Sequence, residues 1–198
     1  MLMDGGADPK FTNRQGIGAL YLAIKGKSLP IIQSLVKMHV PIYNNEPHKL
    51  DNSPVFFAVK AGNIDAMEVF VDIGGDQMNH YVNSTGLNPL MYAASIGNFQ
   101  MVNYLTSRSL LINIEDSTGS TVLSKVLEAY DFDLATKLIK RGADINYTNR
   151  DGKTALAVFV QKHRIPIIEY LLANQANPHI EDITGRDACD WAQMSNIC

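Results

Sequence analysis

Glycines that recur every 33 residues are the feature of this 198-residue chain that most constrains its fold. They stand at equal intervals at Gly86, Gly119, Gly152 and Gly185. Glycine marks turns, and self-similarity at a fixed period of about 20 to 50 residues is the signature of repeat architectures. The period therefore predicts an array of small structural units rather than one continuous domain.

Two longer intervals precede these glycines. Gly16 lies 70 residues before Gly86, so Asp51 falls in the intermediate slot and the two repeats there are each 35 residues long. An array normally ends in repeats with a polar outer face, and because neither end has one, we expect the chain to be a fragment of a longer protein. The register predicts the end of a preceding repeat, five complete repeats and the start of a further or capping repeat, at 1–12, 13–47, 48–82, 83–115, 116–148, 149–181 and 182–198.

Other residues that mark helix ends and turns agree with this register. Residues that suit a helix N-cap stand two positions after every glycine slot, and they are Gly18, Ser53, Asn88, Thr121, Thr154 and Asp187. Prolines suit the start of the first helix at Pro54 and Pro89, and the start of a second helix at Pro30 and Pro166. Glycines stand between the predicted helices at Gly62 and Gly97, and after them, as C-caps, at Gly6, Gly74 and Gly142.

Apolar residues within each repeat are spaced as in helices. In the third repeat, Leu90, Ala93 and Ala94 share one helical face, and Met101, Val102 and Leu105 share another. The i, i+3, i+4 spacing is helical and differs from the alternation expected of a strand. Each repeat is therefore predicted to contain two short helices, which makes the chain all-α.

At this point the residues resemble ankyrin repeats. The segments closest to that family's pattern are 86–94 (GLNPLMYAA), 138–146 (LIKRGADIN) and 151–156 (DGKTAL). The resemblance implies an ankyrin-repeat solenoid of stacked helix-turn-helix units with β-turn or hairpin loops. The family's histidine after Thr-Pro-Leu is absent, which indicates a greater reliance on apolar stacking; its positions hold Tyr21, Phe56, Met91, Ser124, Ala157 and Asp190.

The resemblance also implies a function. Ankyrin repeats bind partner proteins on a concave face made of loop tips and first helices, so the chain is expected to be a non-catalytic scaffold or assembly subunit. The alternative is a recognition arm of a larger enzyme or channel. The positions expected to face a partner are Arg14, Gln15, Ile17, Lys25, Lys49, Leu50, Asn52, Lys60, Ser84, Thr85, Leu87, Ser95, Ile96, Ser117, Thr118, Ser120, Glu128, Arg150, Asp151, Lys153, Gln161 and Lys162.

Two features of this face have alternative interpretations. Ile17, Leu50, Leu87 and Ile96 are apolar where solvated residues are expected, which is typical of an interaction patch but also of ordinary isolated apolar residues. Residues 137–164 carry seven basic and two acidic side chains, which form either a solvated surface or a docking site for the acidic part of a partner.

Composition argues against several other classes of protein. A formal net charge of -3 gives no reason to bind nucleic acid, and the chain has no apolar stretch of about 18 residues that could span a membrane. Only two cysteines occur, Cys189 and Cys198, so we interpret them as free thiols in a reducing compartment. The expected location is the cytoplasm, with a nuclear or cytoskeletal assembly as the alternative.

No catalytic motif stands out. The phosphate-binding loop, the His-Glu-x-x-His zinc motif and the nucleophile elbow are all missing from the sequence, and the five histidines lack ligand spacing relative to one another. Asp131 and Asp133 suit a helix start better than a metal site. No enzyme activity, cofactor, metal or small-molecule substrate is therefore expected. Asn146 resembles the asparagines that a 2-oxoglutarate-dependent hydroxylase modifies in ankyrin repeats.

Overall fold

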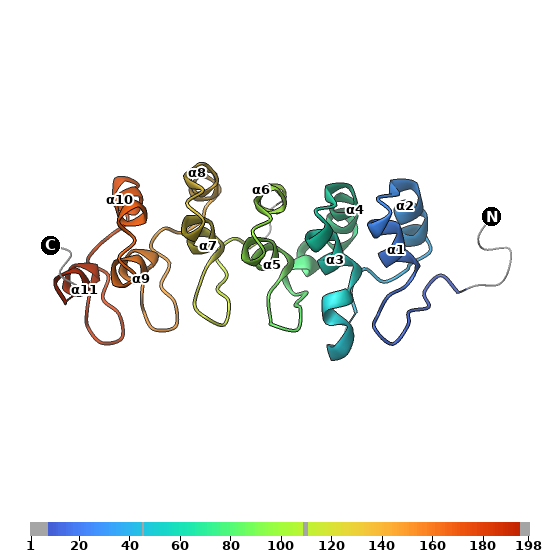
Figure 1. Cartoon of the computed structure of the whole chain (residues 1–198), viewed down its shortest axis with the longest axis horizontal. Helices are drawn as coiled ribbons and strands as arrows, with labels where there is room; N and C mark the ends of the chain where they lie inside the picture. The colour runs from blue at the N-terminus through green and yellow to red at the C-terminus, as the bar shows by residue number, and fades with distance from the viewer. Residues whose placement is uncertain (1–7, 45, 109–110, 195–198) are drawn as a thin grey trace. The chain divides into compact units, whose positions relative to one another are not determined.

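The chain forms two compact units, residues 1–110 and 111–198, in a computed structural model that describes residues 8–44, 46–108 and 111–194. In the described part of the first unit, three helix pairs follow one another: α1 (Ala19–Lys25) and α2 (Leu29–Lys37), α3 (Pro54–Ala61) and α4 (Ile64–Gly74), and α5 (Pro89–Ser95) and α6 (Phe99–Thr106). Helix α3 packs on both α1 and α5. Figure 1 shows α1, α3 and α5 on the side of this unit from which the loops project.

The second unit repeats this arrangement. Its helices are α7 (Val122–Glu128), α8 (Phe132–Lys140), α9 (Ala155–Gln161), α10 (Ile165–Ala173) and α11 (Ala188–Met194). Helix α7 packs on α8, and α9 packs on both α10 and α11 (Figure 1). The predicted all-α fold of helix-turn-helix repeats is thus confirmed. Among the described residues, no helix combines the length and apolar character needed to cross a membrane.

The predicted helix starts are found in the structure. Asn88, Thr121 and Thr154 each accept a hydrogen bond, through a side-chain oxygen, from the backbone N–H three residues further on. Such a cap satisfies a donor that the helix itself leaves unpaired. Pro54 and Pro89 occupy the first helical position, where a missing N–H costs nothing.

Left-handed backbone at the turn between paired helices is common to several repeats. Gly62 and Gly97 have φ of 62° and 71°, and Tyr130 and His163 take the same slot in the second unit with φ of 59° and 53°. This conformation costs a residue other than glycine roughly 1 kcal/mol or more. Because Tyr130 and His163 still adopt it, the packing of the two helices must impose the turn.

One predicted C-cap is wrong. Gly74 has φ of -84° and belongs to α4, whereas Gly75, with φ of 48°, is the left-handed residue. The shift arises because α4 has 11 residues, against 8 in α6, and leads directly into the 3-10 helix η2 (Gly75–Asn79). Gly142 has the positive φ expected of its place, at 97°. Gly6 lies outside the described residues.

The loops between repeats share one hydrogen-bonded hairpin turn. An Asn or Asp opens each turn, and its backbone N–H donates to the carbonyl four residues on, as from Asn83 to Leu87 and from Asp116 to Ser120, each at 3.0 Å. The same residue's Oδ1 accepts backbone N–H groups inside the turn. The glycine three positions later has positive φ, as at Gly86 and Gly119, both 77°. This geometry explains the period of the glycines.

The second repeat departs from the hairpin pattern, so the expected turn is wrong at this point. Its entry segment is the 3-10 helix η1 (Pro47–Asn52). Proline fixes φ near -65°, and Asp51 stands in the slot that glycine fills elsewhere, so a left-handed turn is disfavoured here.

Buried side chains join neighbouring repeats. Leucines or valines at matching positions, such as Val55, Leu90 and Leu156, are at most 1% exposed. In the first unit, the Nδ2 atoms of Asn63 and Asn98 also donate to carbonyl oxygens of the preceding repeat, Ile24 and Val59, at 3.2 and 2.9 Å. Each of these asparagines caps the second helix of its own repeat and bridges to the first helix of the preceding repeat, in repeats that lack the family's histidine.

Candidate partner-binding surface

A hollow in the first unit gathers aromatic side chains on the loop and first-helix face. Its lining includes the stacked pair of Tyr21 and Phe57, whose ring centroids are 3.7 Å apart. Tyr92 meets Phe56 edge-on at 5.8 Å. We call this site the aromatic hollow; it is lined by Tyr21, Asp51, Asn52, Phe57, Lys60, Asn83, Ser84, Thr85, Leu87, Tyr92 and Ser95.

Many of the residues predicted to face a partner meet in this hollow. Those that line it are Asn52, Lys60, Ser84, Thr85, Leu87 and Ser95. Arg14, Gln15 and Lys25 are exposed but lie outside it, and the side chain of Lys49 lies outside the described residues. Sequence register therefore placed these six positions around one hollow of the first unit, and their contact with a partner stays a prediction.

The apolar patch expected on this face is only partly assembled. Leu87 is half-buried in the aromatic hollow, and Ile96, which is 43% exposed, lies on α5's C-terminal end outside it. Ile17 and Leu50 are half-buried and do not line the hollow. Leu87 is thus the member of the set that shares a surface with the aromatic rings.

Hydrogen bonds between successive loop tips hold the rim of the hollow. Asp51 accepts from the backbone N–H of Ser84 at 3.0 Å and from the Ser84 hydroxyl at 2.6 Å. The Nδ2 atom of Asn52 donates to the carbonyl oxygen of Gln15 at 2.8 Å. Burial, aided by the charge of Asp51, raises the pKa of Tyr92, so its phenol stays neutral at physiological pH. The loop residues, which we call the rim, are therefore polar and hydrogen-bonded, while Phe57 and Tyr92 on the first helices, which we call the floor, are aromatic.

The corresponding hollow of the second unit carries the charged side chains of Glu128, Lys153 and Lys162 beside apolar residues such as Val158 and Phe159. We call it the polar hollow; it is lined by Thr118, Gly119, Ser120, Thr121, Leu123, Ser124, Glu128, Asp144, Tyr147, Asn149, Lys153, Ala155, Val158, Phe159 and Lys162. Of the predicted partner-facing residues, Thr118, Ser120, Glu128, Lys153 and Lys162 line it, whereas Ser117, Arg150, Asp151 and Gln161 do not. Lys162 pairs with Glu128 across neighbouring repeats. Arg150 pairs with Glu115 at 2.8 Å.

Asp116 anchors one edge of this surface. Its carboxylate is 7% exposed, lies 2.8 Å from the Lys125 ammonium and accepts hydrogen bonds from Thr118 and Ser120. Burial alone would raise the pKa of Asp116, but Lys125 and the hydroxyl and backbone donors outweigh burial and lower the pKa to about 2. Asp116 is therefore ionised at physiological pH and helps to fix the turn.

Asn146 is half-buried and joins two outgoing loops. Its Oδ1 accepts the backbone N–H of Asn177 at 2.8 Å, and its own N–H donates to Asp144. A hydroxylase would have to reach the Asn146 side chain past this contact. Modification of Asn146 stays a prediction.

Sequence reasoning missed the three aromatic residues of the first hollow. Phe57 and Tyr92 stand 35 residues apart at one repeat position, and Tyr21 precedes that position by one residue in the first repeat. Large half-buried rings recurring at one register position on the first helix are the signal that could have located them. The matching positions in the second unit hold Lys125, Val158 and Trp191.

Comparison with known proteins identifies the family. The family described as "Ankyrin repeats (3 copies)" matches residues 40–117 and 56–149, and "Ankyrin repeats (many copies)" matches residues 130–172. The chain belongs to the ankyrin repeat family, whose members are generally protein–protein interaction modules.

Relatives come from distant sources. An ankyrin repeat-containing protein of Treponema pallidum is 28% identical over 139 residues, covering 70% of this chain and 46% of the relative. An ankyrin repeat protein of Fowlpox virus is 29% identical over 175 residues, or 85% of this chain and 51% of the relative. An ankyrin repeat and SAM domain-containing protein of Rattus norvegicus is 30% identical over 102 residues, 51% of this chain and 11% of the relative. The chain thus spans about half or less of these relatives.

Proposed function

We propose that this chain is a non-catalytic binding module that captures a partner protein in the aromatic hollow of its first unit. The observation that carries the proposal is the meeting of Leu87 with Tyr21, Phe57 and Tyr92 on the face that ankyrin repeats use for partners. Binding energy at interfaces concentrates in aromatic and other anchors near a desolvated centre with a polar rim. The floor and rim of this hollow have that arrangement.

The partner segment is expected to be apolar or aromatic at its centre. The hollow's polar groups, Asp51 and Ser84, are already hydrogen-bonded to each other at 2.6 Å. We therefore expect them to orient a bound partner rather than to attract it by charge. Lys60 is exposed at the edge of the hollow and favours an acidic group beside the apolar anchor.

Affinity capture followed by mass spectrometry tests this function. The full chain is compared with Leu87→Asp and Tyr92→Asp, which place a charge in the hollow. Ile31→Asp serves as the matched control, because Ile31 is 46% exposed on α2, the second helix of its pair. Loss of the same partner in both hollow variants, with retention in Ile31→Asp, supports the proposal. Retention in all three variants at unchanged melting temperature contradicts it.

A second candidate is that the chain acts as a recognition arm of a larger protein. The observation that favours it is the rat relative, whose name includes a SAM domain and of which this chain matches 11%. The intact mass of the natural protein separates the two roles. A mass well above the 21.9 kDa of this chain, with a catalytic or channel domain in the remainder, supports the arm, and a mass equal to it contradicts the arm.

A further inference from the structure

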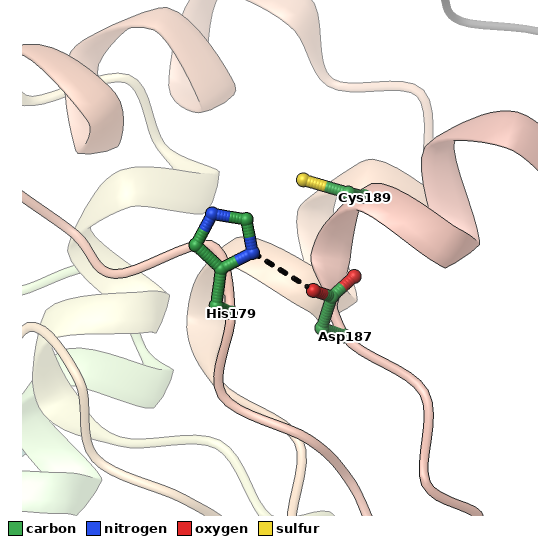
Figure 2. Close-up of side chains that lie close together, drawn as sticks. All are labelled: His179, Asp187 and Cys189. Atoms are coloured by element: carbon green, nitrogen blue, oxygen red, sulfur yellow. Dashed lines mark hydrogen bonds and ion pairs between the residues drawn. The ribbon is translucent and has the colours of Figure 1, made fainter.

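The junction between the fifth repeat and the segment that follows it brings together three side chains that are common metal ligands. His179 lies in the loop after α10, Asp187 directly precedes α11, and Cys189 lies in the first turn of that helix. Nδ1 of His179 is 3.0 Å from Oδ2 of Asp187. One ligand atom from each residue lies within 4.8 Å of the other two, and Figure 2 shows the three side chains converging from the two segments.

The donor types narrow the choice of ion. An imidazole nitrogen, a carboxylate oxygen and a cysteine sulfur are all ligands that zinc uses, whereas magnesium and calcium select oxygen atoms. Zinc–ligand distances of about 2.0 to 2.3 Å put tetrahedral ligand atoms about 3 to 4 Å apart. The observed separations need only small side-chain movements to reach that range. We propose that His179, Asp187 and Cys189 form a zinc site whose fourth position is open to water or to a ligand from a partner.

Backbone contacts hold the two contributing segments in place. The N–H of Ala188 donates to the carbonyl of Pro178 at 3.0 Å, which ties the His179 loop to the start of α11. Asp187 and Asp190 cap each other, because each accepts the other's backbone N–H, at 2.9 and 3.1 Å. This cap engages Oδ1 of Asp187 and leaves Oδ2 facing His179. Such outer contacts orient the ligands of metal sites.

Other repeats do not combine all three ligands. The residue that matches His179 is His80 in one repeat and Asn113 or Asn146 in two others, and each of these asparagines bridges to the next outgoing loop. The residue that matches Cys189 is Leu123 or Leu156, at 2% and 1% exposure. The asparagines at the first of these positions bridge loops, and the leucines at the second pack in the core. The end of the chain combines His179 and Cys189 with Asp187, whose matching positions hold Asn88, Thr121 and Thr154.

A bound ion would link the outgoing loop to α11. Since the ligands belong to two segments that meet only in the folded protein, metal binding would stabilise this end of the second unit against unfolding. The spacing of the five histidines does not indicate this site, because its three ligands are different types of residue.

Cobalt and zinc titrations of the full chain test the site. All proteins carry Cys198→Ser, which leaves Cys189 as the only thiol. We expect one cobalt ion per chain, a thiolate-to-cobalt charge-transfer absorption, displacement of cobalt by zinc and a raised melting temperature. Cys189→Ser should abolish the charge-transfer absorption, and His179→Gln and Asp187→Asn should each weaken binding by about tenfold or more.

His80→Gln is the matched control. His80 also stands three residues before a repeat boundary, and it is exposed, so its replacement should leave cobalt binding unchanged. Asp187→Asn retains an oxygen that can accept the N–H of Asp190, so a folding defect is not expected. Equal binding in Cys189→Ser, or binding that needs Cys189 but neither His179 nor Asp187, would overturn the three-ligand site.

Discussion

The aromatic hollow of the first unit and the polar hollow of the second occupy corresponding repeat positions but differ in chemistry. One position of the first helix holds Phe57 and Tyr92 in the first unit, and Lys125, Val158 and Trp191 in the second. The turns below both hollows are alike, since Asn83 and Asp116 accept the same backbone hydrogen bonds. The repeat thus fixes the backbone and leaves the side chain at this position free to vary.

Because of this difference, we expect the two surfaces to contribute to different properties of partner binding. Half-buried rings such as Phe57 can lose their remaining water on binding and so contribute strongly to affinity. Exposed ion pairs such as Lys162–Glu128 contribute little to stability and act mainly on the rate and register of association. We therefore expect affinity to depend on the first unit.

The largest effect on partner binding is expected from removing two aromatic side chains of the aromatic hollow. Phe57→Ala combined with Tyr92→Ala should lower the affinity for the captured partner by about 2 kcal/mol per ring, or roughly thirtyfold each, because each ring is expected to act as an anchor. Isothermal titration calorimetry with the purified partner measures the loss.

The matched control for this experiment is Lys125→Ala combined with Val158→Ala, at the corresponding positions of the second unit. We expect the partner's affinity to change by less than about threefold in this control. A larger loss from the control than from the ring variant would reverse the roles of the two surfaces.

The next effect concerns the turn shared by both hollows. Asp116→Ala should lower the free energy of unfolding by about 2 kcal/mol, because it removes the acceptor of the Thr118 and Ser120 donors. Asp116→Asn should cost less than about 1 kcal/mol, since Asn83 and Asn149 accept such bonds in their own turns. Urea unfolding measures both values. Equal losses would assign the stabilisation to the Lys125 ion pair rather than to the turn.

Acid should weaken the second unit through the same carboxylate. The pKa of Asp116 is about 2 when folded, against an ordinary value of 3.8, so its contribution to stability is complete above the ordinary value and is lost as the pH falls towards 2. The free energy of unfolding of the natural chain should therefore decline more steeply below pH 3.8 than that of Asp116→Asn. Urea unfolding at a series of pH values compares the slopes, and parallel slopes would contradict the assignment.

The recurring parts of the fold could be predicted from the sequence. Gly86, Gly119 and Gly152 marked the turns, because each turn needs a left-handed residue. Thr121 and Thr154 marked helix starts, because few side chains can cap a helix. Register also placed Ser84, Leu87 and Lys162 on hollowed surfaces.

The departures from the repeat could not be predicted in this way. The 3-10 helix at Pro47–Asn52 replaces a hairpin, and a missing glycine at Asp51 shows only that the usual turn is disfavoured. The stacking of Tyr21 on Phe57 depends on side-chain directions from two repeats, which a one-dimensional register does not contain. The convergence of His179 with Cys189 depends on a loop meeting a helix start, for the same reason.

The smallest expected effect is that of the exposed ion pair in the polar hollow. Lys162 and Glu128 have side chains 48% and 42% exposed, so a double-mutant cycle with Lys162→Ala and Glu128→Ala should give a coupling of less than about 0.5 kcal/mol in urea unfolding. The coupling should shrink further at high salt, because solvent screens exposed charges. If instead the coupling exceeds about 1 kcal/mol and resists salt, the second unit's surface is held by its charges, and the contrast with the aromatic hollow would apply to stability as well as to binding.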